Sequence, residues 1–163
     1  MELQSPQKLV VALGTYHQLQ RKGHELNERF RAAIQLVRDR HKFEIIMEEW
    51  WQQPVQSFAS TLKDPTLKWE NVGTPEEPQF ETWSRGLNCD PPTFDPSKPR
   101  MAEYGPLEAQ ERREAYMAAR IADLMQPHSV GLFIVGLSRL HSMLIKIRIA
   151  GFNVKGFSWT GEL

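Results

Sequence analysis

Two short apolar runs, each followed by a glycine, constrain the fold of this chain more than any other feature. Residues 8–13 read Lys-Leu-Val-Val-Ala-Leu before Gly14, and residues 130–135 read Val-Gly-Leu-Phe-Ile-Val before Gly136. Neither run alternates apolar and polar residues, as a strand with one solvated face would. We therefore predict two strands that other elements cover on both faces, which is the environment of a parallel sheet.

Helical periods separate these strands from further candidates. One apolar stripe at helical spacing runs through Leu26, Phe30, Ala33, Ile34 and Val37. Two more helices are predicted, one over residues 107–125 and one that follows Gly136 and runs to Ala150. Three more strands are predicted over residues 43–47, 67–72 and 152–159. Strands that alternate with helices favour right-handed crossovers. We expect residues 1–163 to form a single-domain, three-layer α/β fold: a mainly parallel sheet of four to five strands with helices on both faces.

Residues 74–106 interrupt this pattern. The segment contains seven of the eleven prolines and has neither a helical nor a strand period. Its aromatic residues argue against a simple disordered linker, because such linkers are poor in large apolar side chains. A loop of this length in a compact domain is either a lid that lines a binding site or a packed insertion without function, and the sequence favours neither.

Composition excludes several classes of function. Twenty basic and twenty acidic residues leave no net charge, which argues against partners such as nucleic acid or an anionic membrane. No apolar stretch is long enough for a membrane span or a signal-peptide core, and the single cysteine, Cys89, has no partner for a disulfide, so we expect a cytoplasmic protein. Zinc spacing and phosphate-binding glycine loops are also missing from the sequence, which disfavours P-loop and dinucleotide chemistry.

Polar residues follow the predicted strands at the edge where open α/β sheets bind ligands. The strand ends deliver His17 through "GTYH", Glu48 and Glu49 through "EEWW", Thr74, and finally Arg139 and His141 through "GLSRLH". We expect the first strand to turn over this edge at Gly14 and so to bring His17 to it. A histidine that faces a carboxylate can act as a general base, and the pair can bind a divalent metal. A histidine after a strand can equally be an ordinary loop residue.

Local geometry narrows these candidates. Strand alternation directs one of Glu48 and Glu49 inward, so we expect the other to be solvated. Arg139 and His141 lie about 200° apart on a helix, so one of them faces the site. Arg113, or Arg112 before it, either pairs with a buried carboxylate near Glu48 or lies on a solvated face. Trp50 and Trp51 are typical of core or lid packing rather than of a stacking platform.

The order and spacing of "LVVALGTYHQLQ", "FEIIMEEW" and "VGLFIVGLSRLHSMLIKIRIAGFNV" resemble the small stand-alone bacterial members of the TraB/PrgY, TIKI, ChaN and erythromycin-esterase superfamily. In that superfamily a Gly-x-x-His after the first strand, an acidic residue after the second and another Gly-x-x-His after a late strand form a hydrolytic or ligand-binding site. Its members include metal-dependent proteases, macrolide esterases and haem-binding proteins. The resemblance implies Gly14 with His17, and Glu48 or Glu49 as the acidic residue.

The second motif departs from this pattern. Counting from Gly136, the position that should hold histidine is Arg139, and His141 follows two residues later. A guanidinium replaces a possible metal ligand with a permanent cation, which opposes metal binding and favours an anionic ligand such as carboxylate or phosphate. His141 compensates for this loss if the turn between strand and helix is shifted.

Three functions follow as hypotheses. The first is a hydrolase of esters, amides or phosphoesters, with His17 as base, Glu48 or Glu49 orienting it or holding a divalent metal, and Arg139 binding substrate charge together with His141, Thr74 and Arg113. The second is a non-catalytic sensor that binds an anionic small molecule. The third is a structural protein that forms a homodimer through aromatic residues within 50–83.

Overall fold

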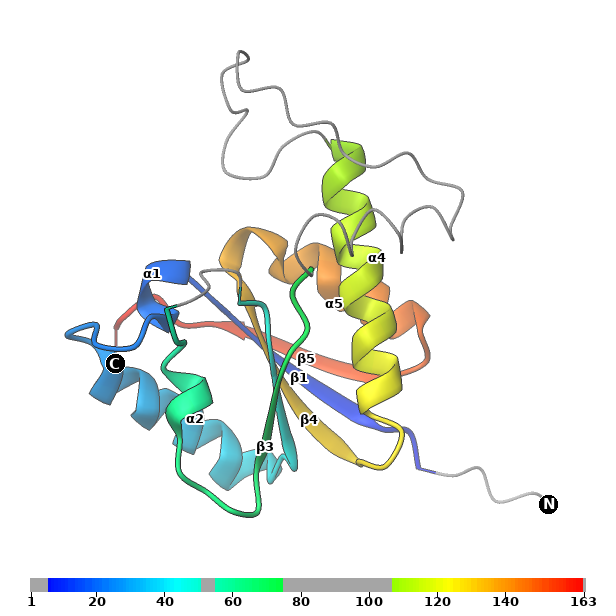
Figure 1. The fold of residues 1–163 in the computed structure, drawn as a ribbon. Helices are drawn as coiled ribbons and strands as arrows, with labels where there is room; N and C mark the ends of the chain where they lie inside the picture. The colour runs from blue at the N-terminus through cyan, green and yellow to red at the C-terminus, as the bar shows by residue number, and fades with distance from the viewer. Residues whose placement is uncertain (1–5, 51–54, 75–106, 163) are drawn as a thin grey trace, which may run out of the picture.

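The computed structural model describes residues 6–50, 55–74 and 107–162. These residues form a five-stranded sheet in which every pair of neighbours is parallel, in the order β3-β2-β4-β1-β5 (Figure 1). The strands are β1 Leu9–Thr15, β2 Ile45–Glu48, β3 Lys68–Asn71, β4 Val130–Gly136 and β5 Asn153–Ser158. The predicted parallel α/β fold is confirmed.

Helices cover both faces of the sheet. α2 (Asn27–His41) lies against one face, and α4 (Leu107–Leu124) and α5 (Leu140–Ile149) pack together on the other (Figure 1). The sequence predicts all three. It does not predict the four-residue helix α1 (His17–Gln20), which directly follows β1, or the 3₁₀ turns η1 (Ala59–Thr61) and η3 (Leu137–Arg139).

Alternate residues of β1 enter two separate halves of the core. Val11 and Leu13 pack with the apolar side of α2, whereas Val10 and Ala12 pack with residues of α4 and α5. All four side chains are fully buried. The run at residues 8–13 is therefore continuously apolar because each face of the strand is covered, and each large side chain buried there stabilises the fold by roughly 1.5–3 kcal/mol.

The glycine at position 14 is explained by packing against α5 and not by a turn of the chain. β1 continues through Gly14 to Thr15, and the chain leaves the strand at Tyr16, whose backbone is still extended. The expectation that the strand turns at Gly14 is therefore wrong. A Cβ atom at position 14 would lie 2.9 Å from Leu140 Cδ2 and 3.1 Å from Leu140 Cβ, so a side chain there would force Leu140 to shift, whereas glycine lets the first turn of α5 pack directly on the strand.

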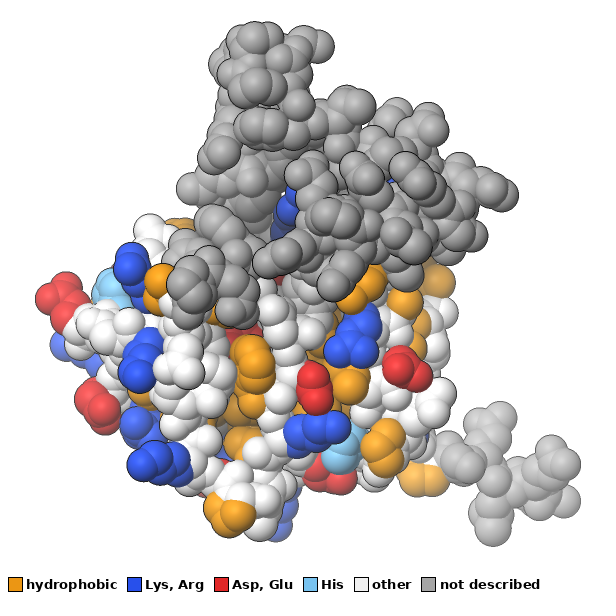
Figure 2. All heavy atoms as spheres, in the orientation of Figure 1, with side chains coloured by type: hydrophobic (Ala, Val, Ile, Leu, Met, Phe, Trp, Pro, Cys, Tyr) orange, Lys and Arg blue, Asp and Glu red, His pale blue; other side chains and the backbone are white. Residues whose placement is uncertain are grey.

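Some predictions lie outside the described residues, among them Trp51 and all of the 74–106 segment except Thr74. Within the described ranges, no helix is both long and apolar enough to cross a membrane. Figure 2 shows basic and acidic side chains interspersed over the visible face of the described part, in keeping with a sequence of no net charge.

Candidate functional site

Three of the residues expected at the carboxyl edge of the sheet lie together. The register pairs Thr15 with Gly136 and Glu48 with Ile134, so the chain leaves β1, β2 and β4 at neighbouring points. His17 Nε2 lies 3.8 Å from Glu49 Oε1, and Arg139 Nε lies 3.1 Å from Glu49 Oε2. We call His17, Glu49, Gly136 and Arg139 the edge cluster.

Gly136 makes room for the contact between histidine and carboxylate. A Cβ atom at this position would lie 2.8 Å from His17 Nε2, so the imidazole would have to shift, and 3.2 Å from Glu49 Oε1, which is a tight contact. The backbone N–H of Gly136 also donates a hydrogen bond to Glu49 Oε1 at 3.1 Å. Gly136, the glycine of the second motif, thus leaves space for His17, the histidine of the first motif, because glycine has no side chain.

A glutamine that the sequence analysis did not select holds the other side of the imidazole. His17 Nδ1 lies 2.8 Å from Gln20 Oε1, and Gln20 Nε2 donates to Glu48 Oε2 at 2.9 Å and to the backbone oxygen of Glu49 at 3.1 Å. Gln20 is fully buried. Because α1 begins at His17, Gln20 is three residues along the same helix face, which is the spacing at which helical side chains meet.

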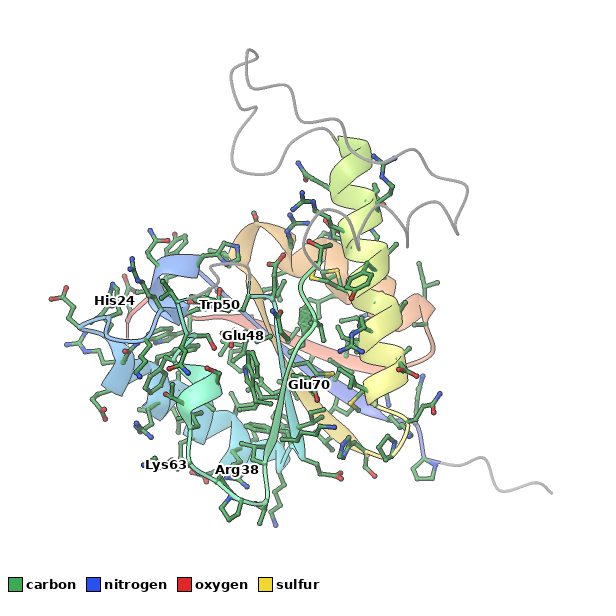
Figure 3. The ribbon with its side chains drawn as sticks, viewed as in Figure 1. His24, Arg38, Glu48, Trp50, Lys63 and Glu70 are labelled. Carbon is green, nitrogen blue, oxygen red and sulfur yellow. The ribbon has the colours of Figure 1, made fainter. Side chains whose placement is uncertain are left out.

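Glu48 is a buried carboxyl group surrounded by neutral donors (Figure 3). It accepts hydrogen bonds from Ser57 Oγ at 2.5 Å and from Trp69 Nε1 at 2.8 Å, besides the one from Gln20. Burial raises the pKa of Glu48 to about 7, and these hydrogen bonds only partly oppose the shift. None of these three donors is an arginine, and the expected pairing of Arg112 or Arg113 with a carboxylate near Glu48 stays a prediction.

The expectation that one of Glu48 and Glu49 is solvated is wrong, because both side chains are buried. Glu48 has the same parity as Ile46 and faces the half of the core that α2 covers, whereas Glu49 meets Gly136 and Arg139. The alternation of side chains along the chain does direct Glu48 and Glu49 to different surroundings. Glu48 has no exposed surface and Glu49 keeps only 7% of its surface exposed, because helices and turns cover both sides of this sheet edge.

Arg139 lies between two carboxylates. Besides Glu49 it faces Glu114 of α4, whose Oε2 lies 3.7 Å from Arg139 Nη1, and both Arg139 and Glu114 are more than nine-tenths buried. Sequence reasoning missed Glu114, although its position carries a signal. It falls three and seven residues before Met117 and Ile121, so it is an acidic residue in the apolar stripe of a helix.

A serine and a lysine of α5 complete the surroundings of Glu114. Ser142 Oγ donates to Glu114 Oε1, and Lys146 Nζ lies 3.3 Å from the same oxygen and 3.2 Å from Ser142 Oγ. Burial alone would lower the pKa of Lys146, but the hydrogen bond to Glu111 and the charge of Glu114 outweigh it and raise this pKa. Lys146 therefore stays protonated and cannot serve as a base for Ser142.

The remaining predicted site residues, His141, Thr74 and Arg113, do not belong to the edge cluster. Arg139, in η3, is buried at the site whereas His141, in α5, is exposed, so one of the two faces the site, although they do not lie on one α-helix. Thr74 is half-buried beyond β3, and no described contact joins it to the edge cluster. Arg113 is half-buried on α4, directly before Glu114.

The edge cluster does not fit a divalent metal. Glu49 accepts a hydrogen bond on Oε1 and pairs with the Arg139 guanidinium through Oε2, so a metal there would compete with a fixed cation. Among the residues that the structure describes, no three His, Cys, Asp or Glu side chains form a group that could hold a metal ion.

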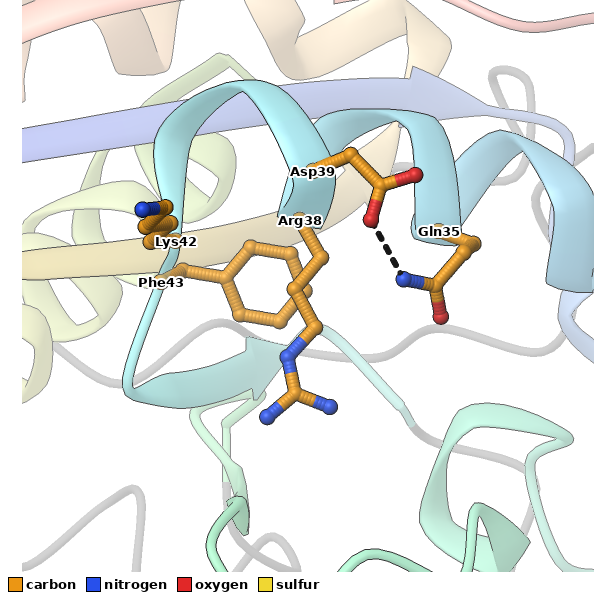
Figure 4. A pocket seen from close by; sticks show the side chains of 5 residues that line it. All are labelled: Gln35, Arg38, Asp39, Lys42 and Phe43. Carbon is orange, nitrogen blue, oxygen red and sulfur yellow. Dashed lines mark hydrogen bonds between the residues drawn. The ribbon is translucent and has the colours of Figure 1, made fainter.

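A surface hollow lies far from this edge. It is lined by Gln35, Arg38, Asp39, Lys42 and Phe43, at the end of α2 and just before β2, which is the amino end of the sheet (Figure 4). Gln35 Nε2 donates to Asp39 Oδ1 at 2.8 Å across one helical turn. The hollow is lined by polar side chains at the end of α2 and by the core residue Phe43, and we assign no function to it.

Comparisons of the chain with protein-family models, with curated proteins and with solved structures give no match. The geometry of the carboxyl edge is therefore the basis for a function.

Proposed function

We propose that this protein is a small hydrolase in which His17 is the general base. The observation that carries the proposal is the way the imidazole is held: Nδ1 lies against Gln20, while Nε2 is directed toward Glu49 over Gly136. A general base must be kept in one orientation, and a buried hydrogen-bonded neighbour does this. The side chain of His17 remains 12% exposed, so the ring has access to the surface.

In the proposed reaction, Nε2 takes a proton from a water molecule while the water oxygen forms a bond to the carbonyl carbon of the substrate. The tetrahedral intermediate then breaks its bond to the leaving group, which receives the proton back from His17. Glu49, 3.8 Å from Nε2, stabilises the imidazolium that exists between these steps. Arg139 and the Gly136 N–H hold the Glu49 carboxylate in place.

The charges near His17 favour an uncharged ester or amide over a phosphoester. Two buried carboxylates, Glu49 and Glu114, surround the Arg139 guanidinium, so this cation is already neutralised within the described residues. An anionic ligand at Arg139 would be repelled by these two carboxylates. This weakens the alternative of a non-catalytic sensor for an anionic small molecule, which depends on Arg139.

Two further proposals, the superfamily membership and the homodimer, have less support from the contacts of the site. Membership of the TraB/PrgY, TIKI, ChaN and erythromycin-esterase superfamily is supported by the close approach of residues from both glycine motifs and an acidic residue. A homodimer formed through aromatic residues loses part of its support, since Trp50 is 1% exposed and Phe58 is 5% exposed. Both are core residues.

A panel of uncharged esters and amides, assayed with and without chelator, tests the hydrolase. We expect His17→Asn to lower turnover by about 10²- to 10⁴-fold, the usual contribution of a general base. His141→Asn is the matched control, because His141 is exposed on α5, and it should leave turnover unchanged. Equal activity of His17→Asn and the wild type would overturn the proposal, provided thermal unfolding shows both to be folded.

A further inference from the structure

We infer that Gln20 and Glu48 are positioning residues that keep the single proton of neutral His17 on Nδ1, which makes Nε2 the nitrogen that takes up a proton. The role of this tautomer in catalysis rests on the proposed function. The tautomer itself follows from the hydrogen bonds alone.

The direction of the Gln20 amide is determined by what surrounds its nitrogen. Nε2 lies 2.9 Å from Glu48 Oε2 and 3.1 Å from the backbone oxygen of Glu49. A backbone carbonyl accepts hydrogen bonds and never donates them, so the group that faces it must be the NH₂. The flipped amide would place its oxygen against the Glu49 carbonyl in a fully buried site, with no donor between the two.

The direction of the amide in turn determines the protonation of the ring. With both N–H groups of Gln20 engaged, its Oε1 is the atom that lies 2.8 Å from His17 Nδ1. An amide oxygen is an acceptor, so Nδ1 must be the donor and carry hydrogen. In the neutral ring the lone pair then belongs to Nε2, the nitrogen that is directed toward Glu49.

Glu48 helps to hold the Gln20 amide in this direction. Its Oε1 accepts hydrogen bonds from Ser57 and from Trp69 of β3, and its Oε2 accepts one from Gln20 of α1, so residues from separate parts of the chain hold both carboxyl oxygens. The backbone oxygen of Glu49 accepts from Gln20 whether or not Glu48 carries a proton. The direction of the amide therefore does not depend on the charge of Glu48.

Nitrogen NMR of protein labelled with ¹⁵N-histidine tests the inference without any substrate. Long-range ¹H–¹⁵N correlations distinguish a protonated from an unprotonated ring nitrogen, and His17→Asn identifies the signals of His17 by their loss. At a pH where the ring is neutral, we expect Nδ1 protonated and Nε2 unprotonated. In Gln20→Met the proton should move largely to Nε2, the nitrogen that bears it in histidine free in water. Gln18→Met, an exposed change on the same helix, should leave the tautomer as it is.

A proton on Nε2 in the wild type, or an unchanged tautomer in folded Gln20→Met, would overturn the inference. If Gln20→Met does not fold, the wild-type spectrum alone decides. The outcome is separable from that of the hydrolase assay. An Nδ1–H ring in an inactive protein would count against the proposed function only, whereas an active enzyme with its proton on Nε2 would count against the roles of Gln20 and Glu48 only.

Discussion

The carboxyl group of Glu48 couples the stability of the fold to pH. Burial raises its pKa from 4.5 to about 7, so the folded protein holds this proton at pH values where the unfolded chain has released it. Stability that depends on this proton is fully present below about pH 4.5 and is lost as the pH rises through about 7. The same carboxyl group accepts the hydrogen bond from Gln20. The polar network beside His17 therefore contains a buried group that lowers the stability of the fold at high pH.

We predict that Glu48→Gln removes this pH dependence. From about pH 5 to about pH 8, the free energy of unfolding of the wild type should fall by roughly 2–3 kcal/mol more than that of the variant, because one unit of pKa shift corresponds to about 1.4 kcal/mol. Urea denaturation across this range measures the difference. The readout is the slope of the unfolding free energy against pH and not its absolute value, because the new amide also changes hydrogen bonds and so shifts the stability at every pH. Glu25→Gln, at an exposed site, should follow the wild type. Parallel slopes for wild type and Glu48→Gln would refute the prediction.

At the scale of the elements, Arg139 joins three parts of the fold. It lies in η3 and pairs with Glu49, which follows β2, and with Glu114 of α4. All three side chains are more than nine-tenths buried, so their charges depend on one another. Such a network adds little stability over an apolar core, but the removal of one member leaves the others uncompensated.

Arg139→Leu should therefore destabilise the protein by about 3–5 kcal/mol, because it leaves Glu49 and Glu114 as buried carboxylates without their cation. Adding Glu114→Leu should restore part of this loss, and urea denaturation of the two single variants and the double variant measures the coupling. Arg148→Leu, at an exposed position of α5, should change stability by no more than about 0.5 kcal/mol. Strictly additive effects of Arg139→Leu and Glu114→Leu would show that the two side chains do not interact.

The elements differ in how far sequence reveals them. β1 and β4 could be predicted because strands covered on both faces must be continuously apolar, and α2 because its apolar stripe spans three turns. α1 could not, since four residues are too few to show a period. That omission hid Gln20, whose relation to His17 exists only if both lie on one helical turn.

At the scale of the whole molecule, the strand order creates the edge cluster. β4 lies between β1 and β2, so the glycine that ends β4 is next to both His17 and Glu49. The alternation of strands and helices predicts parallel neighbours, but helical crossovers of this length are compatible with several strand orders. The sequence could therefore nominate His17, Glu49 and Arg139 as residues of one edge, whereas their contacts, and the burial of both glutamates, depend on the order of the strands.

The same arrangement predicts that stability does not depend on a divalent metal. At the edge cluster Glu49 already pairs with Arg139, a permanent cation that opposes the binding of a metal ion there. A cation bound to the folded state would raise the melting temperature by mass action. We therefore expect the melting temperature of the purified protein to be unchanged by chelator and by added zinc, manganese or magnesium. His17→Asn provides the matched comparison. A fall in the melting temperature on chelation that is present in the wild type and absent from His17→Asn would place a metal at His17 and refute the expectation.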